Sequence, residues 1–273
     1  TNIPMQSFKS LVEKYKQAGI PTYTELIIGL PEETYESWAD GLQEVLEAGH
    51  HEGINIYLCI LLPNSEMSDP ECQARYKIKS VRTPMLQNHC TPDDSSQEFY
   101  DIVIETGSMN QDEWLKAYML AWAVQTFHTF GLTQDLAIWA RSIGVSYRAF
   151  YESLINFCHL HATSLIGREY YLTSLEVWRS QSGHGKWGKI GYGDILWPLE
   201  EWSFLALIQD PQALYQDLMA FLIQLLPHLE QAIIKKVDAQ AETIRDPSEF
   251  ASIKEFAREV VWYGRKGGKF KKV

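Results

Sequence analysis

The sequence predicts an α/β fold, with strand–helix units at the beginning and a mainly α-helical region after them. Two observations lead to this fold class. The order helix, glycine, strand occurs twice in the first sixty residues with a period of thirty, since Ala18-Gly19 recurs as Ala48-Gly49. From about residue 110 onward, apolar and aromatic residues recur at helical spacing instead. The expected divisions are 1–65, 66–109 and 110–273.

The first unit begins with a helix and ends with a strand. Apolar residues follow Phe8 at helical spacing, and Ala18-Gly19 is a typical helix end. Residues 22–28 (TYTELII) predict a strand that stops at Gly29 and Pro31.

The second unit repeats this order. Thr34 can cap a helix whose apolar face comprises Trp38, Leu42, Val45 and Leu46. Residues 54–62 predict a strand that is almost continuously apolar, as expected for a parallel strand covered on both faces. Two units cannot close a barrel, and an uncovered apolar edge promotes aggregation, so we expect an upstream region to complete the sheet.

After residue 65, the sequence predicts a connector, then helices, then a glycine-rich break and further helices. Residues 66–109 predict an irregular connector with one strand at 99–106. A helix begins after Asn110, which has capping-box spacing to Glu113, and another begins near residue 146. A glycine-rich break at 183–193 precedes helices at 198–208 and 211–240.

Composition limits the functional classes. The 273 residues are 45% hydrophobic and 22% charged, which argues against disorder, and no run approaches the roughly 18 apolar residues of a membrane helix. A net charge of -11 disfavours nucleic-acid binding. Four scattered cysteines and no signal-peptide pattern predict a cytoplasmic protein without disulfides. The basic tail, 264–273, can meet a phosphate or an acidic partner, but a solvated terminus explains it more simply.

Several motifs have simpler structural explanations. Residues 183–190 (GHGKWGKI) match both GxGxxG and GxxxxGK, but Ile190 replaces the magnesium-binding Ser or Thr and no strand precedes them, which favours a flexible surface loop. Cys158 and His161 share a helical face, yet no second cluster completes a metal site, so we predict no metal ligands and a buried pair. The acid pairs 32–33, 93–94 and 200–201 suit solvent-facing turns or helix starts.

A family resemblance lies in the two strand ends. Residues 25–34 (ELIIGLPEET) resemble the IxGLPGET strand end of radical S-adenosylmethionine (SAM) enzymes, and residues 61–67 (LLPNSEM) resemble LLPGTEM at the end of the next strand. The stretches 103–109, 144–152 and 261–270 are similar to the C-terminal region of the cobalamin-binding branch. The resemblance implies that the chain supplies the last βα units of a partial TIM-like barrel, followed by a mainly α-helical C-terminal domain over the active site.

The resemblance also implies a cofactor site. In the family these strand ends hold the adenosine of SAM, which carries over to Glu25, Ile27, Gly29, Leu30, Glu32, Leu61 and Leu62. Two positions depart from the motifs, because Glu25 and Glu32 stand where the family has glycine.

The implied [4Fe-4S] cluster has no ligand motif here, because the sequence contains no CxxxCxxC. We therefore expect the cluster, and any cobalamin, to be bound by regions absent from this chain, namely an upstream barrel and cobalamin domain, and the isolated chain to be inactive. Two alternatives stay open. One is a non-catalytic helical protein-interaction module with a degenerate half-barrel, and the other is a nucleotide binder that uses residues 183–189.

Overall fold

The computed structural model describes residues 4–51, 53–86, 88–90, 98–193 and 195–239. Three features singled out from the sequence lie outside these residues: the basic tail at 264–273, the stretch 261–270 and the acid pair 93–94. No helix in the described ranges is both long enough and apolar enough to cross a membrane.

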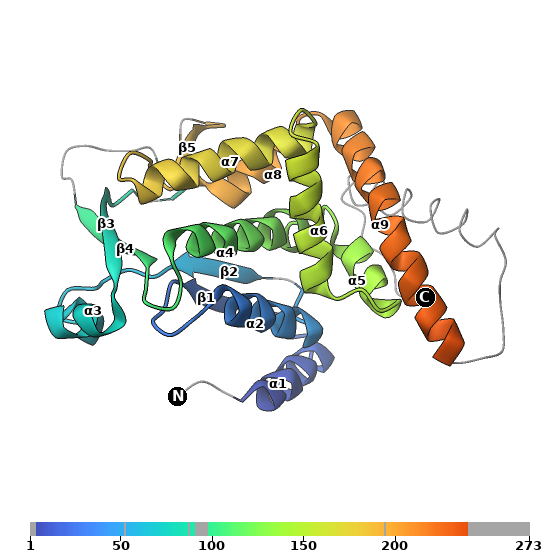
Figure 1. Ribbon diagram of the computed structural model, residues 1–273, viewed down its shortest axis with the longest axis horizontal. Coiled ribbons are helices and arrows are strands. Elements are labelled where there is room, and N and C mark those ends of the chain that lie inside the picture. The colour runs from blue at the N-terminus through green and yellow to red at the C-terminus, as the bar shows by residue number, and fades with distance from the viewer. Residues whose placement is uncertain (1–3, 52, 87, 91–97, 194, 240–273) are drawn as a thin grey trace.

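The predicted repeat of helix and strand is confirmed. The chain begins with α1 (Met5–Gln17), β1 (Thr24–Ile28), α2 (Tyr35–Glu47) and β2 (Ile54–Leu58), which are the blue elements of Figure 1. The two strands pair in parallel, with Thr24 opposite Ile54 and Ile28 opposite Leu58. The α/β class is therefore correct, although β2 is shorter than the strand expected at 54–62.

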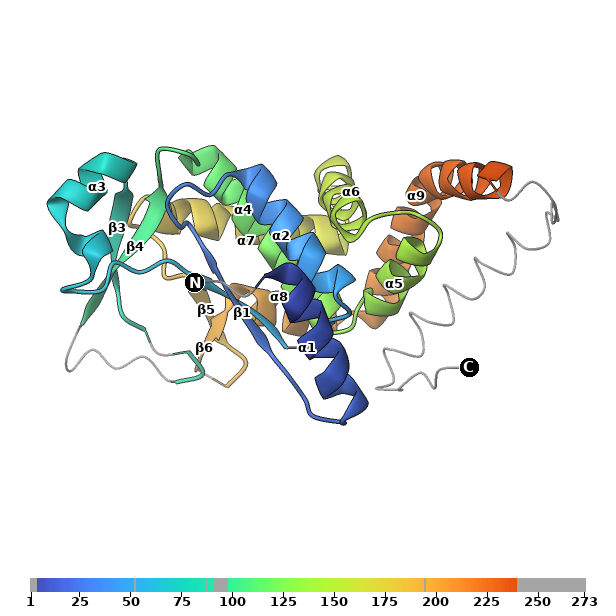
Figure 2. The same ribbon diagram turned by 90° about the horizontal axis from the view of Figure 1, so that it is seen from below.

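The two faces of this sheet differ. On one face, Ile28 and Ile54 are fully buried in the core that the strands share with α2 and α4. The opposite face carries the cross-strand pair Ile27 and Tyr57, which are 45% and 51% exposed. Seen from below in Figure 2, β1 crosses in front of the neighbouring elements. In the described residues, β2 is thus covered on one face, whereas its continuous apolar sequence predicted two.

The connector contains more structure than the sequence indicated. It comprises a 3-10 turn η1 (Glu66–Ser68), α3 (Pro70–Tyr76), β3 (Lys79–Pro84) and β4 (Phe99–Glu105). The expected strand at 99–106 is β4, but the expectation of one strand is wrong, because β3 pairs with it antiparallel. Ile60 also forms an antiparallel bridge with Ile102, so the chain after β2 continues alongside β4.

The remaining elements are mainly helical, as predicted. They are α4 (Gln111–Ala123), a π-helical turn η2 (Val124–Thr129), α5 (Gln134–Ser142), α6 (Tyr147–Leu160), α7 (Leu165–Gln181), α8 (Leu199–Leu207) and α9 (Pro211–Ala239). The Asn110–Glu113 capping box is present. The glycine-rich break is not only a loop, because it contains β5 (Gly188–Gly191), which pairs antiparallel with β6 (Ile195–Pro198) just after the break.

One core joins the beginning of the chain to its helical part. Trp38, Leu46 and Ile54 belong to the same buried cluster as Trp114 and Phe150. Figure 1 shows α2 and α4 side by side with α6 beyond them. The boundaries near 65 and 109 stay predictions, and the shared core holds α2 and its preceding turn against the helices.

Candidate functional site

The carboxyl end of β1 depends on one glycine. Gly29 is buried and has a φ of 96°, which disfavours any residue with a side chain. A Cβ atom at this position would lie 2.9 Å from Trp114 Nε1 and 3.4 Å from the Val103 carbonyl oxygen. Backbone conformation and close packing therefore both require glycine at the end of this strand.

A turn with a left-handed third residue follows each parallel strand. In the β1 turn (residues 30–33), the Glu33 amide donates to the Leu30 carbonyl over 3.4 Å, and Glu32 has a φ of 67°. In the β2 turn (residues 62–65), the Ser65 amide donates to Leu62 over 3.1 Å, and Asn64 has a φ of 65°. A proline at the second position of a four-residue turn and a residue with positive φ at the third position are typical of a type II turn.

These turns explain how the chain tolerates one departure from the family motif. Glu32 replaces the motif's glycine but keeps the left-handed conformation that glycine adopts most easily. Asn64 does the same in the second motif, and asparagine tolerates this conformation better than glutamate. The backbone path is thus glycine-like at both strand ends, although neither residue is glycine.

Glu33 is a functional candidate that the sequence did not reveal. Burial raises the pKa of its carboxyl group to about 7, although a hydrogen bond from the Gly29 backbone lowers it. Its Oε2 atom is buried without a hydrogen-bond partner in the described residues, as is Trp114 Nε1. An acceptor and a donor, both without partners, therefore flank Gly29. Sequence reasoning assigned Glu33 only to the start of a helix, because its burial depends on residues distant in sequence.

The neighbouring thiol responds to the same carboxylate. Burial raises the pKa of Cys59 to about 11, and the nearby Glu33 adds to this. The Cys59 amide donates to the Ile28 carbonyl over 3.0 Å, which holds the ends of the two strands together. Cys59 is thus a neutral, buried thiol at neutral pH.

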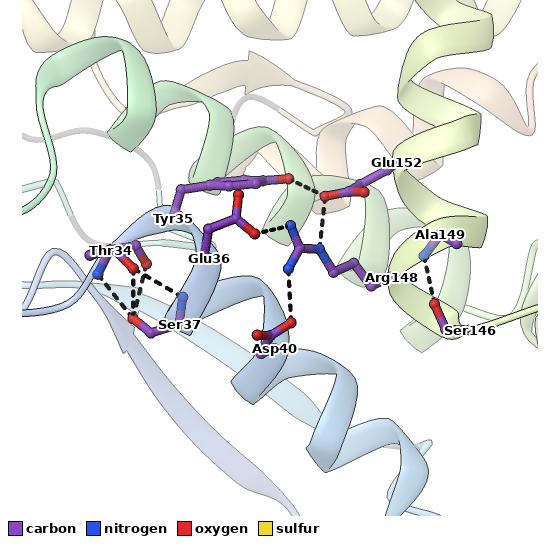
Figure 3. Close-up of polar contacts among 9 residues, drawn as sticks. All are labelled: Thr34, Tyr35, Glu36, Ser37, Asp40, Ser146, Arg148, Ala149 and Glu152. Atoms are coloured by element: carbon purple, nitrogen blue, oxygen red, sulfur yellow. Dashed lines mark hydrogen bonds and ion pairs between the residues drawn. The ribbon is translucent and has the colours of Figure 1, made fainter.

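Contacts at the start of α2 fix the β1 turn in place (Figure 3). Thr34 and Ser37 form a reciprocal capping box, with the Ser37 amide donating to Thr34 Oγ1 over 3.1 Å. The Tyr35 hydroxyl donates to Glu152 of α6 over 2.7 Å. The first turn of α2 is therefore attached to the helical region immediately after the motif.

Arg148 completes this attachment. Its guanidinium group binds Glu36, Asp40 at 2.8 Å and Glu152 at 3.0 Å, and its side chain is 20% exposed (Figure 3). These residues and Tyr35 form what we call the α2–α6 clamp. A half-buried arginine with three carboxylate partners is a stronger attachment than an isolated surface ion pair.

The structure separates the residues predicted to hold the cofactor. Glu25 and Ile27 are exposed on the uncovered face of the sheet, and Leu30, Glu32 and Leu62 are exposed at the strand ends. Gly29 is buried in the turn. Leu61 is 8% exposed and packs with Cys59 and Val103, while its amide donates to the Asp101 backbone carbonyl over 2.8 Å. The side chain of Leu61 thus belongs to the core.

The glycine-rich segment does not resemble a phosphate loop in structure. Lys189 binds the 8%-exposed Glu169 at 3.2 Å, and Ser203 also donates to that carboxylate over 2.9 Å. The lysine therefore neutralises a buried acid, and residues 188–191 form β5, so the expectation of a flexible surface loop is wrong for this half.

The prediction that Cys158 and His161 form a buried pair is only partly correct. Cys158 is 1% exposed, whereas His161 is exposed at the end of α6, so the expected buried pair is half correct. Burial raises the pKa of Cys158 to about 12. Across the described residues, no group of three or more His, Cys, Asp or Glu side chains lies close enough to hold a metal ion.

Two relatives resemble the chain in sequence. It is 36% identical over 171 residues to the cobalamin-dependent radical SAM methyltransferase TokK of Streptomyces tokunonensis. It has the same identity over the same length to 2-(S-pantetheinyl)-carbapenam-3-carboxylate methyltransferase of Streptantibioticus cattleyicolor. This chain is similar in sequence to cobalamin-dependent radical SAM methyltransferases. The resemblance inferred from the strand-end motifs is confirmed.

The match covers 62% of this chain and 25% of each relative. The chain thus spans about a quarter of the length of the curated relatives it matches. No protein-family model matches it.

The residues present fit the two kinds of cofactor differently. The four cysteines lie apart as free thiols, and the described residues offer no ligand set for a [4Fe-4S] cluster. The strand ends, in contrast, have the backbone path of the SAM motif and two buried polar atoms without partners. The described residues therefore have the backbone pattern of the SAM motif, and they offer no ligand set for an iron–sulfur cluster.

Proposed function

We propose that this chain contributes the last two parallel strands of a radical SAM barrel and that their carboxyl ends hold the adenosine of SAM. The observation that carries the proposal is the pair of Leu-Pro-X turns with left-handed third residues at the ends of adjacent parallel strands. Barrels of parallel strands bind their ligands at this end of the sheet.

Each part of the strand end has a task in this proposal. Gly29 lets the strand end pack closely under Trp114, which fixes the backbone path of the β1 turn. Ile27 and Tyr57 form an apolar wall on the uncovered face, on which a planar ring can pack. Glu33 offers one acceptor without a partner among the described residues, its Oε2 atom, at the edge of the site.

The chemistry itself depends on groups that this chain does not hold. When bound, a reduced [4Fe-4S] cluster supplies the electron that cleaves SAM, and we assign this cluster and cobalamin to the upstream barrel and cobalamin domain. This chain's residues bind and orient the adenosine, and the helical region covers the substrate side. The activity of the complete protein, including any methyl transfer, is part of the proposal.

A cavity of about 610 Å³ beside the clamp suits the substrate side. It lies among α2, α4, α6 and α7, and Tyr35 of the clamp lines it. Leu115 and Ile155 provide apolar surface, while Lys116, whose ammonium group is 3.7 Å from the centre of the Tyr35 ring, provides charge. A cavity of this size and mixed lining is typical of small-molecule sites.

Equilibrium dialysis of SAM against the chain tests the proposal. We expect saturable binding that Ile27→Lys weakens at least about tenfold, since the substitution puts a charge on the apolar wall. Both Ile27 and the control position Ile223 are exposed, so Ile27→Lys and Ile223→Lys should fold equally well. The proposal fails if SAM does not bind, or if both variants weaken binding equally.

A second assay tests the assignment of the cluster. The chain, treated with iron, sulfide and a reductant, should not produce 5′-deoxyadenosine from SAM. Cleavage of SAM by the chain alone would refute the assignment of the cluster to another region of the protein.

One observation favours the alternative of a protein-interaction module. Helix α7 carries an exposed apolar stripe that consists of Tyr171, Leu172, Leu175 and Trp178. Exposed stripes of this kind mark protein interfaces. This alternative predicts that Ile27→Lys causes no change in ligand binding, whereas Trp178→Ser abolishes self-association or partner binding in sedimentation experiments.

A further inference from the structure

A chain of buried hydrogen-bonding side chains begins at the opposite end of the sheet from the strand-end turns. His51 Nδ1 lies 3.1 Å from His128 Nε2, and His128 Nδ1 lies 2.7 Å from the Tyr151 hydroxyl. Gln134 donates to the carbonyl oxygens of both His51 and His128. We call His51, His128 and Tyr151 the histidine chain. It connects the segment before β2 to the centre of the helical region.

His128 has an unusual position for a histidine. It is fully buried in the π-helical turn η2, and π-helical turns often occur at functional sites. Both of its ring nitrogens have partners in the histidine chain, and the ring of Tyr147 packs edge-on against it at 5.8 Å. The imidazole is therefore held in one orientation, with only its proton free to change position.

The histidine chain has two complete arrangements of its protons. In the first, the Tyr151 hydroxyl donates to His128 Nδ1, and His128 Nε2–H donates to His51 Nδ1. In the second, His51 donates to His128, His128 donates to Tyr151, and the Tyr151 hydroxyl points to Thr133 Oγ1 at 3.4 Å. The two differ in whether His128 carries its proton on Nε2 or Nδ1.

His51 also lines a cavity of about 560 Å³ at the amino-terminal ends of β1 and β2, which we call the basal cavity. Lys16 of α1, Thr22, His50 and Gln134 line it as well, and no carboxylate does so among the described residues. This is a basic cavity in a protein whose net charge is -11.

Among the described residues, the charges that shift the pKa of His51 act in one direction. Burial, and then the charges of Lys16 and His50, lower the pKa of His51 to about 4. Burial and His51 lower the pKa of His128 to about 3. The groups that face the histidine chain from α6 are the neutral phenols of Tyr147 and Tyr151. Both histidines are thus neutral at pH 7, and an anion in the cavity would oppose the effect of Lys16.

We propose that the basal cavity binds a small oxyanion, a carboxylate or phosphate group, between Lys16 and His51, and that binding sets the proton arrangement of the histidine chain. Before binding, in the first arrangement, His51 carries its proton on Nε2. The anion offsets the charge of Lys16, the His128 Nε2 proton passes to His51 Nδ1, and one proton from water, by exchange, occupies His128 Nδ1. His51 Nδ1–H then donates to His128 Nε2, which leaves the His128 proton on Nδ1, facing Tyr151. With a singly charged anion, one negative charge and one proton enter together, so the net charge of the site does not change.

NMR of the chain with ¹⁵N-labelled histidine tests this proposal, with inorganic phosphate and acetate as separate probes and chloride at equal ionic strength as the control. With phosphate or acetate, we expect saturable shifts of the His51 signals, a rise of about one unit or more in the pKa of His51, and a His128 tautomer with the proton on Nδ1. If only phosphate causes these changes, the natural ligand carries a phosphate group. If acetate causes them as well, the cavity also accepts a carboxylate.

Two matched variants on α1 locate the anion. Lys16→Gln removes the charge that lines the cavity, and Lys14→Gln removes a charge from the same exposed helix outside it. The affinity for phosphate or acetate should fall about tenfold or more in Lys16→Gln and stay within about twofold of the parent value in Lys14→Gln. The proposal is overturned if neither probe binds, if chloride causes the same shifts, if the two variants lose equal affinity, or if the His128 tautomer is unchanged at saturation.

Discussion

The β1 and β2 turns have the same backbone but different surroundings. Each has proline second and a left-handed third residue, Glu32 in one and Asn64 in the other. The β1 turn follows a glycine packed under Trp114 and leads into a capped helix attached to α6. The β2 turn begins with the 59%-exposed Leu62 and leads into η1, which has no side-chain cap. A short local sequence is thus enough to form the turn, while its position depends on distant residues.

The largest expected effect is at Gly29. Gly29→Ala should lower the free energy of unfolding by about 3 kcal/mol, because it combines backbone strain with the clash against Trp114. Gly49→Ala is the matched control, since Gly49 also has positive φ, 81°, but open space around it, and should cost about 1 kcal/mol. Urea denaturation measures both. Equal losses would show that packing under Trp114 contributes nothing.

The next effect is at the clamp. Arg148→Met keeps the aliphatic stem but leaves three carboxylates without their cation, and should cost about 2 kcal/mol. Arg82→Met, which breaks a 3.9 Å pair between exposed groups, should cost less than about 0.5 kcal/mol.

Hydrogen exchange extends this comparison to the two turns. In Arg148→Met, amides in the first turn of α2 should exchange faster, while those of η1 keep their parent rates. Faster exchange at both places would mean that the clamp stabilises the whole fold rather than the β1 turn.

Glu33 should make stability depend on pH. Its carboxyl pKa is raised from 4.5 to about 7 in the folded chain, so its contribution is fully present below pH 4.5 and is lost as the pH rises through 7. Glu33→Gln should remove this loss, making the variant more stable than the parent by about 1–2 kcal/mol at pH 8, after allowance for solvent screening.

The titration of Glu200 does not affect the stability difference between the parent and Glu33→Gln. Burial raises its pKa to about 7 as well, but it titrates in both the parent and the variant, and its contribution cancels in the difference. Parallel stability curves for parent and variant between pH 4.5 and 8 would contradict the burial of the Glu33 carboxyl group.

The smallest expected effect is at the left-handed residues. Glu32→Gly should raise the free energy of unfolding by about 0.5–1 kcal/mol, because relief of strain exceeds the entropy cost of glycine. Asn64→Gly should change it by less than about 0.3 kcal/mol, since asparagine tolerates this conformation. Thermal unfolding of both variants measures the difference. A larger gain in stability from Asn64→Gly than from Glu32→Gly would contradict this prediction.

Local signals in the sequence were sufficient for most elements. The thirty-residue repeat predicted β1, α2 and β2, and Thr34 and Asn110 act as the caps that their spacing indicated. Features that depend on distant contacts were not predictable. The burial of Glu33, the attachment of Tyr35 to Glu152 and the pairing of β3 with β4 each join residues separated along the chain.

In the candidate site, too, the burial of individual residues was not predictable from the local sequence. The motif resemblance placed the site at the strand ends, but it could not distinguish the exposed Leu62 from the buried Leu61, since the two are adjacent and chemically identical. Their difference comes from the bond between the Leu61 amide and Asp101 of β4, a strand forty residues later.

Backbone amide mapping by NMR tests the central claim, that the two strand ends hold the adenosine of SAM. On addition of SAM, the amides of Gly29, Glu32 and Leu62 should shift saturably, adenosine should reproduce these shifts, and methionine should not. Saturable shifts elsewhere with unchanged signals at these three amides, or no saturable shifts at all, would contradict the account.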